Sequence, residues 1–398
     1  MANRRRNFRK KGLNILEKEN KYFKVVSITL LILLAIVAVI FGYKLYMSYK
    51  QKKQIANEQK ETENQIESIF KSADDAINNA NNYKTNTILR LSIAGVIDAN
   101  GIEKYANDNY NFWTDIAQYL NNSDFTIANY KIEQSRNENI ENVIKQTGIN
   151  VLNITNNSDE KIDNLYSALN GKGIQTIGNK YEKEDNNNEE GNKSTNSERV
   201  NIVNKKGINI AFIGYTTNDD KSRNYFTEKN AKADLEYAKK NASVIIVMMD
   251  WKNSIDETTE EQKQQAKFLA DNGANLIIGN NQNNIQTMEI VKGENDKDCF
   301  VAYSLGNLLS LTSIERNKTG IILEIQILVD KDNNTSLNSV DYVSTYILKD
   351  NKQINVLNLK DAISSYEKES ANNNISSTNY AKMKNALERV KKLVNKNN

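Results

Sequence analysis

The sequence predicts a layered α/β protein, because short β-type runs alternate with helical stretches from residue 88 onward. Apolar runs such as VIIVMM (244–249) and NLIIG (275–279) lack polar alternation, which is typical of strands covered on both faces. The roughly 310 residues in this part of the chain are enough for one large hydrophobic core.

The order of the predicted elements follows from these patterns. Strands are expected at 88–94, 124–129, 150–155, 208–215, 243–249, 275–279, 299–305 and 320–329. Helices are expected at 102–120, 159–169, 231–240 and 259–272.

An uncharged apolar run, Val25–Tyr43, precedes this part of the chain. As a helix it would be about 28 Å long, close to the roughly 30 Å hydrocarbon core of a bilayer. A cleaved signal peptide is the alternative, but its apolar region normally spans only about 7–15 residues. We therefore expect a transmembrane signal anchor over residues 25–47, through which the chain contacts the membrane. Basic residues concentrate in the arm 1–24, which predicts a single-pass cell-membrane protein with a cytoplasmic N-terminus and an extracellular main domain.

The remaining boundaries come from composition. Residues 48–87 are polar with partly helical apolar spacing and predict a helical stalk. The main domain is expected over 88–350, with a flexible loop at 181–199, where apolar side chains are absent after Tyr181. Residues 351–398 are expected to form a linker and an amphipathic helix that docks Met383, Leu387, Val390 and Val394 on the domain.

The composition excludes several kinds of chemistry. The chain has no histidine, no proline and a single cysteine, so histidine-based triads, histidine-ligated zinc and an internal disulfide are excluded. Cys299 lies in an apolar run and is expected to be a buried thiol. A glycine-rich phosphate loop is absent, and the basic arm beside an apolar run favours anionic lipid over nucleic acid, so we expect no nucleic-acid partner.

Seven segments together resemble a known family. In order they are LSIAG (91–95), SDFTIAN (123–129), LNITNN (152–157), GINIAFIGY (207–215), ASVIIVMMDW (242–251), GANLIIG (273–279) and AYSLGN (302–307). They resemble the CapA-type bacterial capsule synthesis domain, also called the poly-gamma-glutamate capsule (PGA_cap) domain. The resemblance implies a metallophosphoesterase-like β-sandwich flanked by helices, preceded by one N-terminal transmembrane helix.

The chain departs from that family's pattern where metal ligands are expected. Val96 replaces an aspartate, with Asp98 two residues on, and Lys131 replaces the glutamate of Asn-Leu-Glu. Asn156-Asn157-Ser158 replaces Asn-Asn-His, Asp250-Trp251-Lys252 replaces His-Trp-Gly, and residues 279–283 (GNNQN) replace Gly-His-His-Pro-His. The resemblance thus implies a vestigial site made of Asp98, Asn129, Asn156, Asn157, Asp250, Trp251, Asn281, Asn283, Tyr303 and Asn307.

Two interpretations of these residues follow from their chemistry. A two-metal site needs several anionic or imidazole ligands, whereas asparagine offers only a neutral oxygen. Asp98, Asn129, Asn156, Asp250 and Asn281 form a hard-oxygen set for one magnesium, manganese or calcium ion. The favoured alternative is that Asn and Asp cap strand-end turns here. Trp251, Tyr303 and Trp113 are candidates for a polymer groove, or else core aromatics.

Three functions remain open on the sequence. The favoured hypothesis is a membrane-anchored, non-catalytic CapA-like protein that acts with a surface polymer or its synthesis complex. The second is a metal-dependent hydrolase with a single-metal site of carboxylate and asparagine ligands. The third is a structural assembly module of a cell-surface complex, organised by the stalk and the C-terminal helix.

Overall fold

The computed structural model describes residues 42, 47, 50, 86–102, 105, 112–132, 136–178, 199–218, 221–222, 224–252, 257–280, 283–349, 353–368 and 375–394. The chain divides into two compact units, Met1–Ser68 and Ile69–Asn398, and the second contains the folded domain. The predictions for the arm, the anchor, the stalk and the loop 181–199 therefore lie almost wholly outside the described residues. Among the described residues, no helix combines the length and apolarity needed to cross a bilayer.

Strands and helices alternate through the first part of the domain, as the sequence predicts. The strands are β1 (Thr87–Asp98), β2 (Phe125–Lys131), β3 (Val151–Asn153), β4 (Gln175–Ile177), β5 (Val200–Lys205), β6 (Ile208–Thr216), β7 (Val244–Asp250), β8 (Leu276–Asn280), β9 (Met288–Lys292), β10 (Asp298–Ala302), β11 (Asn307–Leu309), β12 (Thr319–Val329), β13 (Thr335–Lys349) and β14 (Ile354–Asn358). The α-helices are α2 (Ala117–Leu120), α3 (Glu138–Gln146), α4 (Asp159–Gly171), α5 (Glu228–Asn241), α6 (Glu260–Asp271), α7 (Leu359–Lys368) and α8 (Ser377–Val394).

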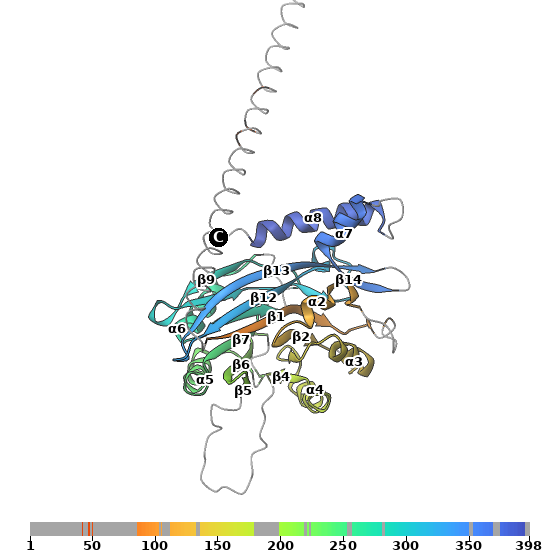
Figure 1. Cartoon of the computed structure of the whole chain (residues 1–398). Coiled ribbons are helices and arrows are strands. Elements are labelled where there is room, and N and C mark those ends of the chain that lie inside the picture. Colours follow the sequence, from red (N-terminus) through yellow and green to blue (C-terminus); the bar gives the residue numbers. More distant parts are fainter. Residues whose placement is uncertain are drawn as a thin grey trace, which may run out of the picture. The chain divides into compact units, whose positions relative to one another are not determined.

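Within the described residues the strands form two mixed sheets. The larger has eight strands in the order β14-β13-β12-β1-β2-β3-β4, with β11 paired to β1, and the smaller has six in the order β5-β6-β7-β8-β10-β9. Helices flank both sheets, so the prediction of an α/β protein is confirmed (Figure 1).

The core lies between the sheets and continues under the helices on either side. Alternate residues of β2 and β7, among them Ile127 and Met248, pack into the core between the sheets. The residues between them face outward: Ala128 packs with α3 and α4, and Val247 with α5 and α6. Both faces of these strands are therefore buried, which explains the uninterrupted apolar runs. Each such side chain contributes about 1.5–3 kcal/mol of burial.

The helices begin at the capping residues that the sequence supplies. Thr259 and Gln262 form a capping box at the start of α6, in which each side chain accepts a hydrogen bond from the other's backbone N–H. Thr227 caps α5 and Asn137 caps α3 in the same way, with the side chain accepting from a backbone N–H.

The predicted helix at 102–120 is wrong over its described residues. Residues 112–120 form only a short 3₁₀ turn, Thr114–Ile116, and α2. The backbone carbonyl of Phe112 accepts a 2.8 Å hydrogen bond from Val356 of β14, and this pairing draws the chain away from a helical path.

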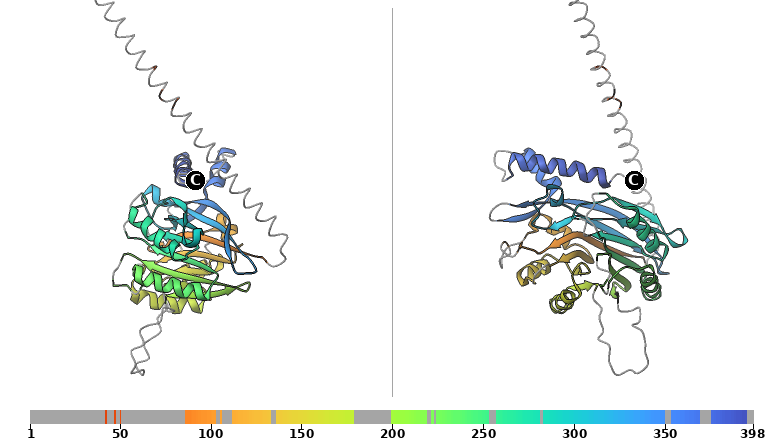
Figure 2. Two further views of the ribbon diagram at one scale, coloured as in Figure 1. Left: turned by 90° about the vertical axis from the view of Figure 1, so that its left-hand side faces the viewer. Right: turned by 180° about the vertical axis from the view of Figure 1, so that it is seen from behind.

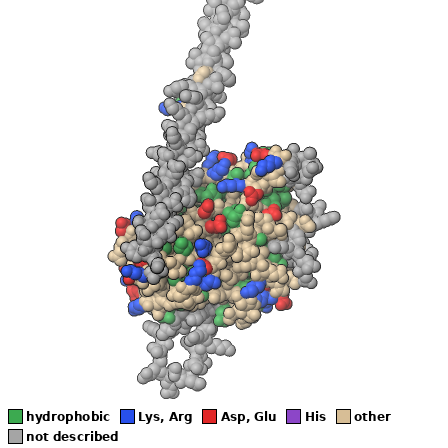
Figure 3. Space-filling model, viewed as in Figure 1, with side chains coloured by type: hydrophobic (Ala, Val, Ile, Leu, Met, Phe, Trp, Pro, Cys, Tyr) green, Lys and Arg blue, Asp and Glu red, His purple; other side chains and the backbone are tan. Residues whose placement is uncertain are grey.

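The C-terminal segment adds structure where a linker was expected. Residues 354–358 form β14 against β13, and α7 follows directly. The amphipathic helix is present as α8, with Met383 and Val390 fully buried. Figure 2 shows α7 and α8 side by side over the larger sheet, where Tyr366 and Tyr380 stack with ring centroids 4.2 Å apart. Figure 3 shows basic and acidic side chains intermixed over these helices. Lys384 of α8 pairs with Glu367 of α7, and Lys382 of α8 pairs with Glu315 of the 3₁₀ turn Glu315–Lys318.

Candidate functional site

The core between the sheets turns polar at the carboxyl ends of the parallel strands. Side-chain alternation continues past the last apolar residue of each strand, so the next residue of the same face stays between the sheets. Ile127 is followed by Asn129, Val151 by Asn153, Met248 by Asp250 and Ile278 by Asn280. All four polar side chains are buried, at no more than 1% exposure. We call Asn129, Asn153, Asp250 and Asn280, with their contacting polar residues, the carboxyl-edge cluster.

The half of the cluster on the larger sheet is an ordered asparagine network. Asn153 Nδ2 donates to Asn129 Oδ1 at 2.8 Å, and Thr155 Oγ1 donates to Asn153 Oδ1 at 3.0 Å. These bonds fix both amide orientations and leave the buried Nδ2 of Asn129 without a partner. The Nδ2 of Asn129 is therefore a buried N–H donor in this half of the cluster. Asn156 lies beyond the end of β3, and its buried Nδ2 also lacks a partner.

The half on the smaller sheet presents oxygen atoms. Asp250 Oδ2 accepts from Thr216 Oγ1 at 2.7 Å and from Asn218 Nδ2 at 2.6 Å, while Oδ1 is buried without a partner. Asn280 Nδ2 donates to the carbonyl of Met249, which leaves Asn280 Oδ1 likewise without a partner. Burial raises the pKa of the Asp250 carboxyl to about 6, although both hydrogen bonds and the nearby charge of Lys131 act to lower it.

The two halves meet directly. A methyl group at Gly214 of β6 would lie 2.6 Å from Thr155 Cγ2 and 3.1 Å from Asn153 Oδ1, so glycine permits this close approach of the sheets. On the other flank, Val96 of β1 pairs with both Asn129 and Asn307. Gly306, at a φ of +68°, makes the turn that places Asn307 at this edge.

The other predicted polar residues have different roles. Asn283 has a positive φ of 54° and offers its backbone carbonyl to Asn307. Asn307 and Asn157 bind backbone: Asn307 Nδ2 donates to the carbonyls of Asn283 and Asn317, and Asn157 Nδ2 to that of Tyr130. Asp98 accepts from the backbone N–H of Asn100 and so caps the turn after β1. Asn281 lies outside the described residues.

The predicted aromatic residues lie away from the cluster. Trp251 and Tyr303 point to the opposite face of the smaller sheet, in the core under α5 and α6, with ring centroids 5.6 Å apart. Trp251 Nε1 donates to Gln265, and Tyr303 Oη donates to Glu289. Trp113 is also fully buried, so the core interpretation of all three aromatics holds. Cys299 is a buried thiol whose pKa burial raises, as expected.

Sequence reasoning missed Asn153, Thr216 and Asn280. The signal was available in the strand alternation. Asn153 and Asn280 each lie two residues beyond an apolar residue that faces the other sheet, and Thr216 ends its strand at the same edge. Extending the strand alternation by one step would have selected Asn153 and Asn280 in place of Asn156 and Asn281.

The cluster does not fit a pair of divalent metal ions. Two ions about 3.5–4 Å apart need several anionic ligands, and the described residues contain no group of three Asp, Glu, Cys or His that could hold a metal. The Oδ1 of Asn129 already accepts from Asn153, which leaves that side chain an N–H donor where a metal ion needs a lone pair.

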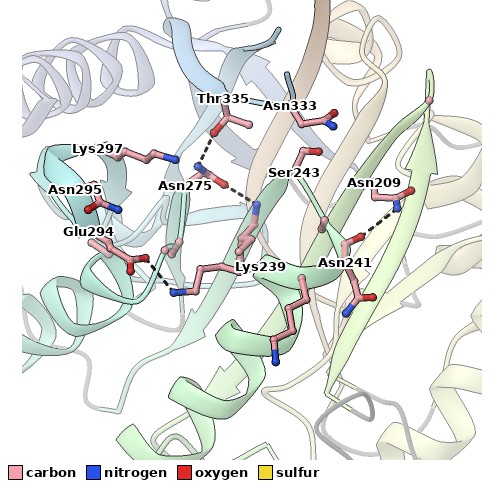
Figure 4. A pocket seen from close by; sticks show the side chains of 17 residues that line it. Asn209, Lys239, Asn241, Ser243, Asn275, Glu294, Asn295, Lys297, Asn333 and Thr335 are labelled. Carbon is pink, nitrogen blue, oxygen red and sulfur yellow. Dashed lines mark hydrogen bonds and ion pairs between the residues drawn. The ribbon is translucent and has the colours of Figure 1, made fainter. Parts of the chain in front are cut away.

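A pocket lies elsewhere, at the amino ends of β6, β7 and β8 (Figure 4). It measures about 540 Å³ and is lined by Lys239, Asn275, Glu294 and other polar residues. Asn275 accepts from the backbone N–H of Ile245 and donates to Thr335, and Lys239 pairs with Glu294 at 3.0 Å. These polar groups already bind the protein itself.

Comparison with known proteins identifies the family. The family model "Bacterial capsule synthesis protein PGA_cap" matches residues 38–312, more than half of the chain. The chain belongs to this family. The resemblance that the sequence motifs indicate is therefore confirmed.

Individual relatives are more distant. The PGA biosynthesis protein CapA of Bacillus subtilis (strain 168) is 26% identical over 199 residues, which cover 46% of this chain and 48% of that protein. The match thus spans about half the length of that curated relative. Two solved structures are similar: a hypothetical protein from Thermus thermophilus (11% identity, TM-score 0.43, 64% of this chain and 98% of that one) and a novel phosphatase from Mycoplasma pneumoniae (8%, 0.41, 65% and 93%).

Proposed function

We propose that this protein is a non-catalytic PGA_cap member that takes part in the synthesis or export of a capsule-type surface polymer. Family membership supports the link to capsule synthesis, and the relative from Bacillus subtilis is a PGA biosynthesis protein. The carboxyl-edge cluster supports the lack of turnover, because it offers amide donors where a two-metal hydrolase needs anionic ligands. That donor set is the observation on which the proposal depends.

The proposal includes the location. An uncharged run at 25–43 with a basic flank before it supports a membrane anchor with the domain on the outer surface. A domain held there would meet the exported polymer, or the complex that makes it, as its partner.

A second candidate, a hydrolase with a single hard cation, keeps one specific observation in its favour. Asp250 Oδ1 and Asn280 Oδ1 are both buried oxygen atoms without a partner. Oxygen atoms of this kind are the ligands of magnesium, manganese and calcium. In such an enzyme these two atoms would hold the ion, which would activate a water molecule.

One experiment separates the two candidates. The full-length protein, purified in detergent, is assayed for phosphomonoester and phosphodiester hydrolysis with added magnesium, manganese or calcium, beside Asp98→Ala and Asp250→Ala. Our proposal expects no turnover above the variants. Metal-dependent turnover that disappears in Asp250→Ala would reject it and establish the hydrolase.

A further inference from the structure

Two of the three fully buried carboxylates among the described residues form ion pairs. Glu141, Asp234 and Asp250 are all 0% exposed. Arg136 binds Glu141 at 2.6 Å, and Arg199 binds Asp234 at 2.7 Å. A buried charge without compensation strongly destabilises a fold, which explains these pairs. For Asp250, the hydrogen bonds from Thr216 and Asn218 supply no positive charge.

Lys131 is the cation that the fold directs toward Asp250. In β2, Phe125 and Ile127 face the smaller sheet, so Asn129 and Lys131 lie on that same side. In β7 the same alternation turns Asp250 toward the larger sheet. Both residues are the last of their strands, at the edge where the close approach at Gly214 brings the sheets together.

The electrostatics agree with this geometry. The positive charge of Lys131 acts to lower the pKa of Asp250, so the ammonium group attracts the carboxylate. Asp98 lies directly opposite Lys131 in the register of β1 and β2. Lys131 therefore lies at the end of β2, beside Asp98 of its own sheet and on the side that faces Asp250 of the other sheet.

We propose that the Lys131 ammonium group is a built-in counter-cation of the carboxyl-edge cluster, in the role that bound metal ions have in two-metal enzymes. It offsets part of the cost of burying the charge of Asp250 without any exchangeable ion, and it excludes divalent cations by repulsion. This inference rests on the proposed non-catalytic function and adds a physical reason for it. The fold then needs no metal to tolerate a buried carboxylate at this edge.

A charge-removal series tests the pairing in the full-length protein at neutral pH. Lys131→Met leaves Asp250 buried without its cation, so we expect its melting temperature to fall by several degrees. The double variant Lys131→Met/Asp250→Asn removes both charges and should recover most of that loss, while Lys240→Met, an exposed lysine at the other edge, should change nothing. An unchanged melting temperature for Lys131→Met, or an equal loss in the double variant, would overturn the proposal.

A charge-reversal variant tests the exclusion of metal. Lys131→Glu adds a carboxylate beside Asp98 and Asp250, so manganese chloride should raise its melting temperature but leave the wild type and Lys131→Met unchanged. A wild type stabilised by manganese, or a Lys131→Glu variant that does not respond, would contradict the proposal. If Lys131→Glu fails to fold, Lys131→Gln carries the test, with a weaker manganese response expected. Failure of the proposed function would instead appear as wild-type turnover, which these melting measurements do not involve.

Discussion

At the amino end of the stacked sheets, Asn275 uses both atoms of its amide, one to accept from Ile245 and the other to donate to Thr335. At the carboxyl end, Asn280 uses only its Nδ2, and its buried oxygen has no partner. The amino end also holds a pocket of about 540 Å³, yet its polar side chains are engaged in holding strands and helices together. The amino end thus offers a pocket whose polar groups are engaged, whereas the carboxyl-edge cluster contains buried polar atoms without partners, on Asn129, Asp250 and Asn280.

The difference shows which asparagines are structural. A side chain whose polar atoms are all bonded to the backbone or to neighbours stabilises a turn, whereas an unpaired buried polar atom destabilises the fold by about 1–3 kcal/mol. Such atoms are rare in native proteins and call for a specific explanation, such as a functional role or a bound water or ion. The carboxyl-edge cluster has this character.

The largest expected effect comes from the carboxylates at the two ends. Because the pKa of Asp250 is raised to about 6 in the folded protein, its ionisation opposes folding once the pH exceeds the unfolded value of about 3.9. Asp250→Asn should therefore raise the free energy of unfolding by about 3 kcal/mol at pH 7, with little gain near pH 4. Urea unfolding of the wild type and the variant at pH 4 and pH 7 measures the gain in stability at each pH.

Asp124, at the amino end of β2, is the matched control. Burial acts to raise the pKa of its carboxyl, but hydrogen bonds from the Arg90 backbone and from Lys206 outweigh this and lower it. Asp124→Asn should therefore destabilise the protein at pH 7, with the loss shrinking as the pH falls below the unfolded value. The comparison between the two ends breaks if both variants change stability in the same direction.

An intermediate effect on stability is expected when Asn275 and Asn280 are each replaced by alanine. Asn275→Ala leaves the N–H of Ile245 without its acceptor and should lower the free energy of unfolding by about 1–2 kcal/mol. Asn280→Ala removes a side chain that is only half bonded, so its loss should stay below about 0.5 kcal/mol. Chemical denaturation of both variants gives the two losses in the free energy of unfolding. Equal losses would show that the unpaired oxygen of Asn280 has a partner in solution.

The smallest effect is expected for the ion pair between Lys239 and Glu294 in the amino-end pocket. Lys239 and Glu294 are both more than a third exposed, so Lys239→Ala should change the free energy of unfolding by less than about 0.5 kcal/mol, and high salt should remove the difference. A larger, salt-resistant loss in thermal melts would mean that this pocket holds its charges more rigidly than the exposed geometry indicates.

The sequence predicts the parallel strands of this fold well because their signal is local. Uninterrupted runs such as 244–249 identify a strand buried on both faces, and every predicted strand corresponds to an observed one. The strands β4, β5, β9, β11, β13 and β14 were not predicted. In the long strand β13 polar side chains interrupt the pattern, and this strand forms by pairing with β12 and β14. That pairing is a tertiary effect, as is the contact of Phe112 with Val356 that breaks the predicted helix.

The site was predicted only in part, for a related reason. Motif resemblance located Asn129 and Asp250 but selected Asn156 and Asn281 by position in the motif rather than by strand face. The orientations that decide the chemistry, with N–H donors on one sheet and oxygen atoms on the other, depend on hydrogen bonds between strands such as Asn153 to Asn129. No spacing within a single strand contains that information.

Calorimetric titration of the full-length wild-type protein with manganese is the most direct test of the central claim. That claim is that the carboxyl-edge cluster does not hold a pair of metal ions. The account predicts no saturable heat at concentrations where two-metal phosphoesterases are fully loaded. Tight binding of two ions per chain, abolished in Asp250→Ala, would contradict it.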